Sequence, residues 1–206
     1  MFDYYTTQEK FWAGEFGNDY VDRNTGKSLV VNNIALFSKV FKNTDNLRSI
    51  LELGANIGLN LMAVHSLLPS AKITAIEINK KASEIMTKLD YIEVINSSFL
   101  NFQLDMKWDF VFTKGVLIHQ NPDMLEKVYE LLYNASNRYV FICEYYNIVP
   151  VEVNYRGYNS VLFKRDFAGE IMDKYPDLKL VDYGFVYHRD PNFPDNDDLN
   201  WFLMEK

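Results

Sequence analysis

Apolar and polar positions along the chain predict repeated strand and helix units. Short apolar runs of strand length occur at five places: residues 49–53, 73–77, 93–96, 109–113 and 139–144. The first, fourth and fifth runs are almost uninterrupted, as parallel strands buried on both faces should be. Apolar residues at helical spacing fill the segments between them: residues 59–68, 80–89 and 123–135. We therefore predict an α/β fold with a doubly wound, mostly parallel sheet and helices on both faces.

The C-terminal part has a different pattern. Residues 178–187 and 199–205 both have strand character, and a loop rich in Asp, Asn and Pro separates them. No crossover helix fits into that loop, so we expect the two strands to pair antiparallel as a hairpin. The expected sheet then has seven strands in a Rossmann-like arrangement. Within the loop, we interpret the polar run 195–198 as solvated.

We expect one domain that covers residues 1–206. A sheet core at 28–206 opens with an apolar helix at 28–41 and carries an insertion on the substrate side at about 145–165. Residues 1–27 are rich in aromatic side chains, and two arrangements remain open for them. They form either a lid over a pocket or a helix docked on the sheet.

Composition and charge restrict the classes of function. The chain has 206 residues and 48% of them are hydrophobic, which suffices for a full core. The formal net charge of -7 argues against a protein that holds a nucleic-acid backbone on a basic surface. We find no apolar stretch of about 20 residues and no secretion signal, so we expect a soluble cytoplasmic protein without a membrane partner. The single cysteine, Cys143, lies in an apolar run and is interpreted as a core residue.

The sharpest local pattern is a strand that runs into a glycine turn and then into a helix. Gly54 suits a tight turn, and Gly58 lets the helix pack close to the strand. The spacing lacks the third glycine with which a helix N-terminus approaches a pyrophosphate, so a dinucleotide is disfavoured. Farther along the chain, the second strand ends at Glu77. A carboxylate at that position can accept hydrogen bonds from both hydroxyls of a ribose.

This combination resembles the class I S-adenosylmethionine-dependent methyltransferases. Glu52, Gly54 and Gly58 match the acidic residue and the glycine turn of their first motif, and Glu77 matches their ribose acid. The resemblance implies S-adenosylmethionine as the cofactor and no metal. Together with the local pattern it gives these candidate cofactor-binding residues: Arg23, Glu52, Gly54, Asn56, Gly58, Glu77, Ile78, Ser97, Ser98, Phe99, Thr113, Lys114 and Gly115.

Three parts of that set have distinct expected roles. In the family, the end of the third strand supplies adenine contacts, which here means residues 97–99. This sequence has serines where an acidic residue is common. After the fourth strand, residues 113–115 are expected at the methionine end of the cofactor, with Arg23 near its carboxylate.

A closer resemblance covers most of the chain. Several segments look like the pseudaminic acid biosynthesis-associated methylases: FWAGEFG at 11–17, IHQNP at 118–122, NYRG at 154–157 and FKRDF at 163–167, with Tyr20, Arg23 and Asn24. This resemblance implies a cytoplasmic enzyme that acts on a small molecule. The expected acceptor is a nonulosonic sugar of the pseudaminic or legionaminic type, or its precursor, free or nucleotide-linked.

Residues after the fourth and fifth strands are candidates for the chemistry. Methyl transfer from a sulfonium requires an aligned acceptor, exclusion of water and removal of a proton. His119 is the candidate base, and support of the Asn121-Pro122 turn is its alternative role. Tyr145 is the second catalytic candidate. The three histidines of the chain are isolated and show no ligand spacing, so no metal site is expected.

Aromatic and basic side chains after the fifth strand suit an acidic sugar. Rings stack on sugar faces, and arginine holds a carboxylate or phosphate through paired hydrogen bonds. The candidate substrate-binding residues are Tyr146, Asn147, Tyr155, Arg156, Lys164 and Arg165. Next to them, Asp166 is interpreted as the N-cap of a helix at 167–175.

Our leading hypothesis is N-methylation of an amino or amidino group on such a sugar, because no strong base constellation is visible. O-methylation is one alternative. A nicotinamide-dependent sugar oxidoreductase is another, although the missing third glycine counts against it. A third is a cofactor-binding but inactive partner protein. The sequence leaves the oligomeric state open.

Overall fold

The computed structural model of the protein describes residues 4–24, 26–194 and 196–206. Its helices are α1 (Thr7–Ala13), α2 (Glu15–Arg23), α3 (Lys27–Phe41), α4 (Leu59–Leu67), α5 (Lys80–Met86), α6 (Leu125–Ala135) and α7 (Phe167–Lys174). Its strands are β1 (Ser49–Leu53), β2 (Lys72–Glu77), β3 (Ile92–Asn96), β4 (Trp108–Lys114), β5 (Ser136–Glu144), β6 (Val151–Glu152), β7 (Phe163–Lys164), β8 (Lys179–Val186) and β9 (Leu199–Glu205). Short 3₁₀ turns occur at Phe99–Asn101, Leu117–His119 and Pro122–Met124.

One seven-stranded sheet organises the fold, in the order β3-β2-β1-β4-β5-β9-β8. The pairs within β1 to β5 are all parallel, whereas β9 pairs antiparallel with both β5 and β8. The mostly parallel seven-stranded sheet and the antiparallel C-terminal hairpin predicted from the sequence are therefore confirmed. Strand order reverses direction between β1 and β4. In doubly wound folds, the crevice at the carboxyl ends of two such strands is where ligands bind.

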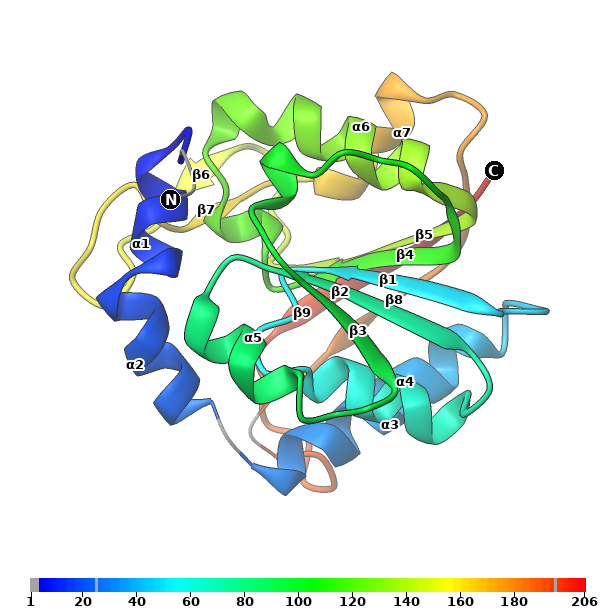
Figure 1. The fold of residues 1–206 in the computed structure, drawn as a ribbon. Helices are drawn as coiled ribbons and strands as arrows, with labels where there is room; N and C mark the ends of the chain where they lie inside the picture. Colours follow the sequence, from blue (N-terminus) through cyan, green and yellow to red (C-terminus); the bar gives the residue numbers. More distant parts are fainter. Residues whose placement is uncertain (1–3, 25, 195) are drawn as a thin grey trace.

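Helices cover both faces of the sheet, as predicted. Helices α3, α4 and α5 lie on one face, and α6 and α7 lie on the other (Figure 1). Alternation along β4 explains this layering, because Phe110 and Phe112 face Phe37 of α3 while Val111 packs with Val128 of α6. Each face of the sheet thus has a core of its own.

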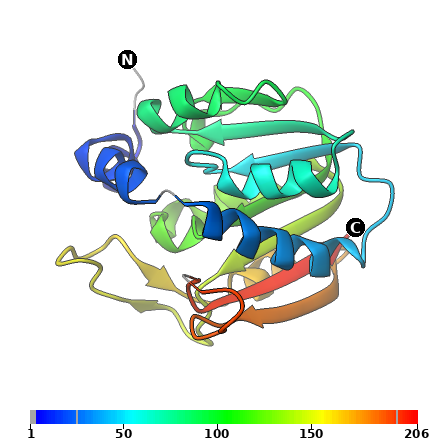
Figure 2. The same ribbon diagram turned by 90° about the horizontal axis from the view of Figure 1, so that it is seen from below.

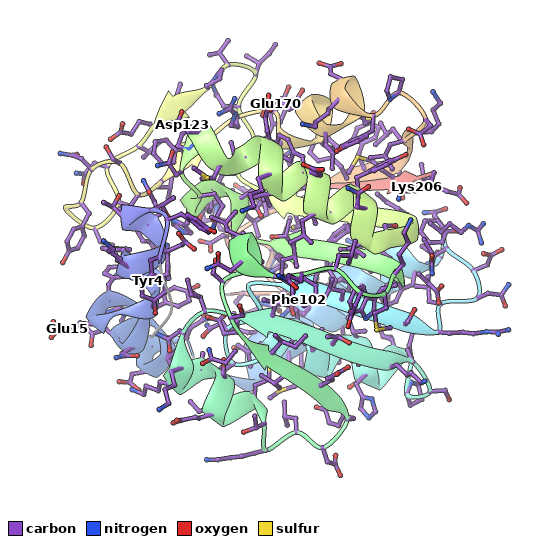
Figure 3. The ribbon with its side chains drawn as sticks, turned by 45° about the horizontal axis from the view of Figure 1, so that its top comes forward. Tyr4, Glu15, Phe102, Asp123, Glu170 and Lys206 are labelled. Carbon is purple, nitrogen blue, oxygen red and sulfur yellow. The ribbon has the colours of Figure 1, made fainter. Side chains whose placement is uncertain are left out.

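Two segments cover the edge where the parallel strands end. Helices α1 and α2 and the β6–β7 hairpin all lie at this edge (Figure 2). The Gln8 side chain donates a hydrogen bond to the Ser160 carbonyl at 2.8 Å, and the Phe11 and Tyr158 rings meet edge to face. The described part of residues 1–27 therefore lies over the carboxyl ends of the strands and not on a sheet face. Figure 3 places Glu15 of α2 and the C-terminal Lys206 at opposite ends of the molecule.

Some element limits differ from those predicted. The expected helix at 123–135 opens with a 3₁₀ turn, because the Asn121 side chain accepts from the Asp123 N–H and Pro122 starts the turn. The helix expected at 80–89 ends at Met86 and continues as a tight turn. Asp166 caps α7 through the Gly169 N–H as predicted, and Cys143 is a buried core residue. No helix in the described ranges is both long and apolar enough to cross a membrane.

Candidate functional site

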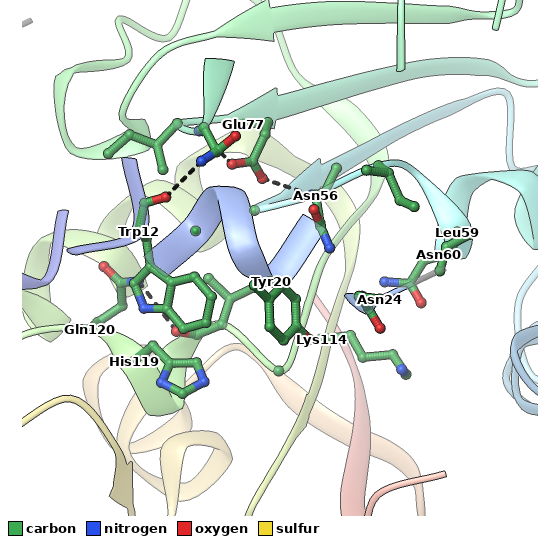
Figure 4. A pocket seen from close by; sticks show the side chains of 18 of the residues that line it. Trp12, Tyr20, Asn24, Asn56, Leu59, Asn60, Glu77, Lys114, His119 and Gln120 are labelled. Atoms are coloured by element: carbon green, nitrogen blue, oxygen red, sulfur yellow. Dashed lines mark hydrogen bonds between the residues drawn. The ribbon is translucent and has the colours of Figure 1, made fainter. Parts of the chain in front are cut away.

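A cavity opens at the carboxyl ends of β1, β2 and β4, where the strand order reverses. The volume in which the centre of a water molecule fits is about 220 Å³. Its walls come from α1 and α2, the glycine turn after β1, the ends of β2 and β4, and the loop between β8 and β9. Trp12 and His119 lie on one side of the pocket, and Lys114 and Asn60 lie on the other (Figure 4).

The turn after β1 forms the floor of the cavity. Gly54 has a positive φ of 74°, and a Cβ there would meet the Val116 side chain at 2.7 Å. The backbone N–H groups of Gly54 and Ala55 both donate to the Ile76 carbonyl, so the turn is joined to the end of β2. A glycine is required at this position by both the backbone conformation and the close approach of Val116.

Glu77 ends β2 and lines the cavity with a buried carboxylate. Its oxygens accept the backbone N–H of Asn56 at 2.7 Å (Figure 4) and that of Asn79 at 2.6 Å. Burial raises the pKa of Glu77, and the backbone N–H groups of Asn79, Asn56 and Ile78 oppose the rise. A carboxylate offers about four acceptor positions, so Glu77 can also accept from a hydroxyl donor in the cavity.

Two polar side-chain groups in the cavity wall have no hydrogen-bond partner among the described residues. The Asn56 amide and the Trp12 indole N–H are buried donors without an acceptor. Gly115 has open space where a Cβ would lie, and its φ of 68° also disfavours a side chain. Buried polar groups without partners indicate a bound ligand or water. The cavity therefore fits a ligand with hydroxyl and other polar groups.

His119 lies in the 3₁₀ turn after β4. Its Nδ1 is 2.6 Å from the Val161 carbonyl oxygen, so we assign the proton to Nδ1 and leave Nε2 as an acceptor. Burial lowers the pKa of His119 to about 4. The ring is therefore neutral at physiological pH but is a weak base. Its hydrogen bond goes to Val161, whereas the Asn121-Pro122 turn is held by Asn121 itself.

Glu144 fixes the backbone of this turn from the end of β5. Its carboxylate accepts the N–H groups of Val116 at 2.9 Å and Leu117 at 3.0 Å. Burial raises the pKa of Glu144 to about 7, against those backbone bonds. Glu144 was not among the residues predicted from the sequence.

Several solved structures with a similar fold are methyltransferases. The chain matches the plantazolicin methyltransferase BpumL in complex with SAH with a TM-score of 0.68 and 16% identity, over 97% of this chain and 94% of that one. It matches the magnesium protoporphyrin IX methyltransferase ChlM from Synechocystis PCC 6803 with bound SAM with a TM-score of 0.67 and 12% identity over both whole chains. The fold is the Rossmann-like methyltransferase fold. A third match is the Burkholderia thailandensis 1,6-didemethyltoxoflavin-N1-methyltransferase, with a TM-score of 0.68, 11% identity and coverage of 97% and 86%. No protein-family model and no curated protein sequence matches the chain.

Within this methyltransferase fold, the predicted cofactor residues divide into two groups. Those that line the cavity are Gly54, Asn56, Glu77, Ile78, Ser98, Phe99, Lys114 and Gly115. Those that lie outside its lining are Arg23, Glu52, Gly58, Ser97 and Thr113. For the second group, direct contact with a cofactor stays a prediction that the cavity lining does not support.

Each residue in the second group has a structural reason for its place. Arg23 is exposed on α2 and lies over the Phe16 ring. Gly58 takes a left-handed conformation at the start of α4 and packs against Met86. The Ser97 hydroxyl bonds to the Ser98 carbonyl, and Thr113 is buried within β4.

Glu52 lies directly behind the cavity wall. One of its oxygens accepts from the Asn60 side chain at 2.6 Å, and the other has no partner among the described residues. Burial raises the pKa of Glu52 to about 8, while Asn60 and Lys114 act in the opposite direction. Asn60 and Lys114 both line the cavity, so Glu52 acts on a ligand only through them.

Glu9 of α1 places a buried carboxylate beside the end of β3. The Ser98 hydroxyl donates to the Glu9 carboxylate at 2.5 Å, and Glu9 also accepts the Thr6 N–H as part of a capping box. Both residues line the cavity. The Thr6-x-x-Glu9 spacing marks the start of a helix in the sequence, but it contains no information about the contact with Ser98.

The predicted acceptor-side residues of the 145–165 region lie outside the cavity lining. They are Tyr145, Tyr146, Asn147, Tyr155, Arg156, Lys164 and Arg165. Arg165 is paired with Glu170 at 2.6 Å, the Lys164 ammonium lies over the Tyr145 ring, and Asn147 bonds to the Val149 carbonyl.

Two of these residues lie in the hairpin between β6 and β7. Arg156 is exposed with a φ of 51° in the hairpin turn, and Tyr155 packs its ring 5.2 Å from that of His119. The expected basic grip on an acidic sugar is therefore not inside this cavity.

Asp197, in the run 195–198 that was expected to be solvated, is exposed and also lines the cavity. Burial, and after it the charge of Asp197, raises the pKa of the Tyr145 hydroxyl. That charge also acts on Tyr20 and His119. Residue 195 lies outside the described residues. Nothing local in the sequence separates Asp197 from its acidic neighbours.

Asn79 joins the N-terminal helices to the sheet. Its side-chain oxygen caps α5 through the Ala82 N–H, and its amide donates to the Trp12 carbonyl and to Asn18, each at 3.0 Å. We predict that Asn79→Ser keeps the cap but loses both donated bonds, which loosens α1 and α2 by about 1–2 kcal/mol. Hydrogen exchange measured by mass spectrometry should then speed up in residues 7–23 and stay unchanged in α5. Equal acceleration in α5 would show that the substitution acts through the cap.

The lowered pKa of His119 gives a second prediction. The unfolded chain binds a proton near the ordinary pKa of 6.5, whereas folded His119 does so only near about 4. Stability contributed by neutral His119 is therefore lost as the pH falls below 6.5. Between pH 7.5 and 5.5, the wild type should lose about 1 kcal/mol more unfolding free energy than His119→Gln. Urea denaturation at the two pH values measures this, and equal losses would contradict the burial of a neutral ring.

Proposed function

We propose that the protein transfers a methyl group from S-adenosylmethionine to a small-molecule acceptor. The observation that carries this proposal is the buried Glu77 carboxylate, which faces the cavity beside the Gly54 turn at the point where the strand order reverses. The methyltransferases of the same fold support it, because they were crystallised with SAM or SAH. The cofactor supplies an electrophilic methyl group on a sulfonium.

The cavity residues fit the parts of that cofactor. The free acceptor position on Glu77 suits a ribose hydroxyl, and Ile78 and Phe99 offer apolar surface for an adenine ring. Lys114 is the only lysine or arginine in the lining among the described residues, so we assign the methionine carboxylate to it and not to Arg23. The unpartnered Asn56 amide adds one donor.

We infer that the acceptor is a nonulosonic sugar or its precursor, methylated on nitrogen. The resemblance to the pseudaminic acid-associated methylases supports the sugar class, since Trp12, His119 and Gln120 of the resembling segments line the cavity. The protonation states support nitrogen. His119 is a weak base with a pKa of about 4, and burial raises the pKa of Tyr20 to about 12. A hydroxyl acceptor needs a base in the transition state, whereas an amine can lose its proton to water before it attacks.

Glu77→Gln should raise the Kd of S-adenosylhomocysteine by about tenfold to a hundredfold, the range for loss of a hydrogen bond to a charged group. Isothermal titration calorimetry measures the Kd, and circular dichroism verifies the fold. Glu84→Gln on the exposed face of α5 is the control and should bind as the wild type does. A folded Glu77→Gln protein with unchanged affinity would remove Glu77 from the cofactor site.

The reaction itself is tested with methyl-labelled S-adenosylmethionine and a panel of nonulosonates that carry free amino, amidino or acylated amino groups. We expect labelled methyl on nitrogen, located by NMR of the product. Methyl found only on oxygen would contradict the choice of atom. Tight S-adenosylhomocysteine binding without turnover on any sugar would favour the inactive partner, and binding of NAD in its place would favour the oxidoreductase.

A further inference from the structure

The charged side chains in the cavity differ in how many protein hydrogen bonds they already accept, and therefore in how freely they can bind a ligand. Among the described residues, the acidic side chains in its lining are Glu9, Glu77 and Asp197, and Lys114 is its ammonium group. Glu9 accepts hydrogen bonds from three protein donors and Glu77 from two backbone N–H groups. Asp197 is exposed to solvent and lies near the Tyr145 hydroxyl. After the proposed cofactor has occupied Glu77 and Lys114, Asp197 is the charge that remains for the acceptor.

Three aromatic side chains of the cavity lining pack against one another. The Trp12 ring lies 5.2 Å from that of Tyr20 and 4.6 Å from that of His119, centroid to centroid, and all three residues line the cavity with Asp197. The faces of such rings attract cations. The His119 Nε2 is a second acceptor on the same side, because Nδ1 donates to Val161.

The loop that carries Asp197 is fixed on both sides. The Asn32 side chain of α3 donates to the Pro194 carbonyl at 2.5 Å. On the other side, Asp198 accepts both the backbone N–H and the ring of His188 at 2.9 and 2.8 Å. Asp198 does not line the cavity, so two adjacent aspartates of one loop have different environments.

We infer that Asp197 is a specificity-determining residue that binds the acceptor as a protonated amine, with Trp12 and Tyr20 as the walls of the subsite. This inference rests on the proposed function and adds the charge of the acceptor group to it. The basic residues Arg156 and Lys164 lie outside the cavity, where the carboxylate of an amino sugar acid can remain in solvent. An N-acylated acceptor lacks the positive charge and is discriminated against.

The proposed methyl transfer to the bound amine consists of a proton loss and a displacement at the methyl carbon. The bound ammonium first loses one proton, which passes by way of the Asp197 carboxylate to water on the exposed side. The nitrogen lone pair then forms a bond to the methyl carbon, the carbon–sulfur bond breaks, and its electron pair stays on sulfur. The products are S-adenosylhomocysteine and a methylated ammonium, which keeps its charge next to Asp197.

The test uses two six-membered rings that differ in charge, cyclohexylamine and cyclohexanol. Each is titrated into S-adenosylhomocysteine-loaded protein and followed through the NMR signal of the Trp12 indole N–H. Cyclohexylamine is protonated at neutral pH and should bind about tenfold more tightly than cyclohexanol. The Trp108 indole, which donates to Thr74 in the core, is the internal reference and should not shift.

Two matched variants locate the effect. Asp197→Asn should abolish the preference for the amine and leave the Kd of S-adenosylhomocysteine unchanged, whereas Asp198→Asn should keep the preference. Equal binding of amine and alcohol by the wild type would overturn the inference, as would an equal loss in both variants. A weaker S-adenosylhomocysteine complex in Asp197→Asn would also overturn it, because Asp197 would then serve the cofactor.

The binding of S-adenosylhomocysteine tests the proposed function separately from the subsite. If the protein does not bind S-adenosylhomocysteine, the methyltransferase proposal fails. The two ring compounds are then titrated into the free protein, and an amine preference that depends on Asp197 still supports the subsite.

Discussion

The arrangement of the site depends on one buried carboxylate, that of Glu77. Its oxygens collect backbone N–H groups from the turn after β1 and from the start of α5, so a single side chain fixes the relative positions of β1, β2 and α5. Asn79, whose N–H is one of those donors, also holds α1 and α2 through its side chain. Helices α1 and α2, which cover the strand ends, are therefore joined to the sheet through Asn79 and Glu77, and both residues also line the cavity.

Glu77 belongs to a set of three carboxylates at strand ends, with Glu52 on β1 and Glu144 on β5. Burial raises the pKa of each of them. Between the ordinary pKa of 4.5 and the raised values of about 7 and 8, the folded protein holds protons that the unfolded chain has released. Stability from Glu52 and Glu144 is accordingly lost as the pH rises through that window.

The sequence predicted the parts of this structure that depend on local pattern. Buried parallel strands need uninterrupted apolar runs, and a tight turn at positive φ needs glycine, so β1, Gly54 and the end of β2 could be located. Glu9 and Asp197 could not, because each reaches the cavity through contacts with residues distant in the chain. Arg156 and Lys164 were predicted to bind the acceptor, but they lie outside the cavity lining. Their positive charge suited an acidic ligand, but residue type does not determine on which side of a hairpin a side chain lies.

The protonation states of the cavity side chains and the elements that carry them both bear on the proposed amine acceptor. Burial keeps His119 neutral and Tyr20 protonated, so neither is a strong base, while Asp197 is exposed to solvent. Such a site favours a nucleophile that releases its proton before the transfer step. Trp12 and Tyr20 come from α1 and α2, whereas Asp197 comes from the loop before β9. The proposed acceptor subsite is thus complete only when the N-terminal helices lie over the carboxyl ends of the strands, which is the position that Asn79 holds.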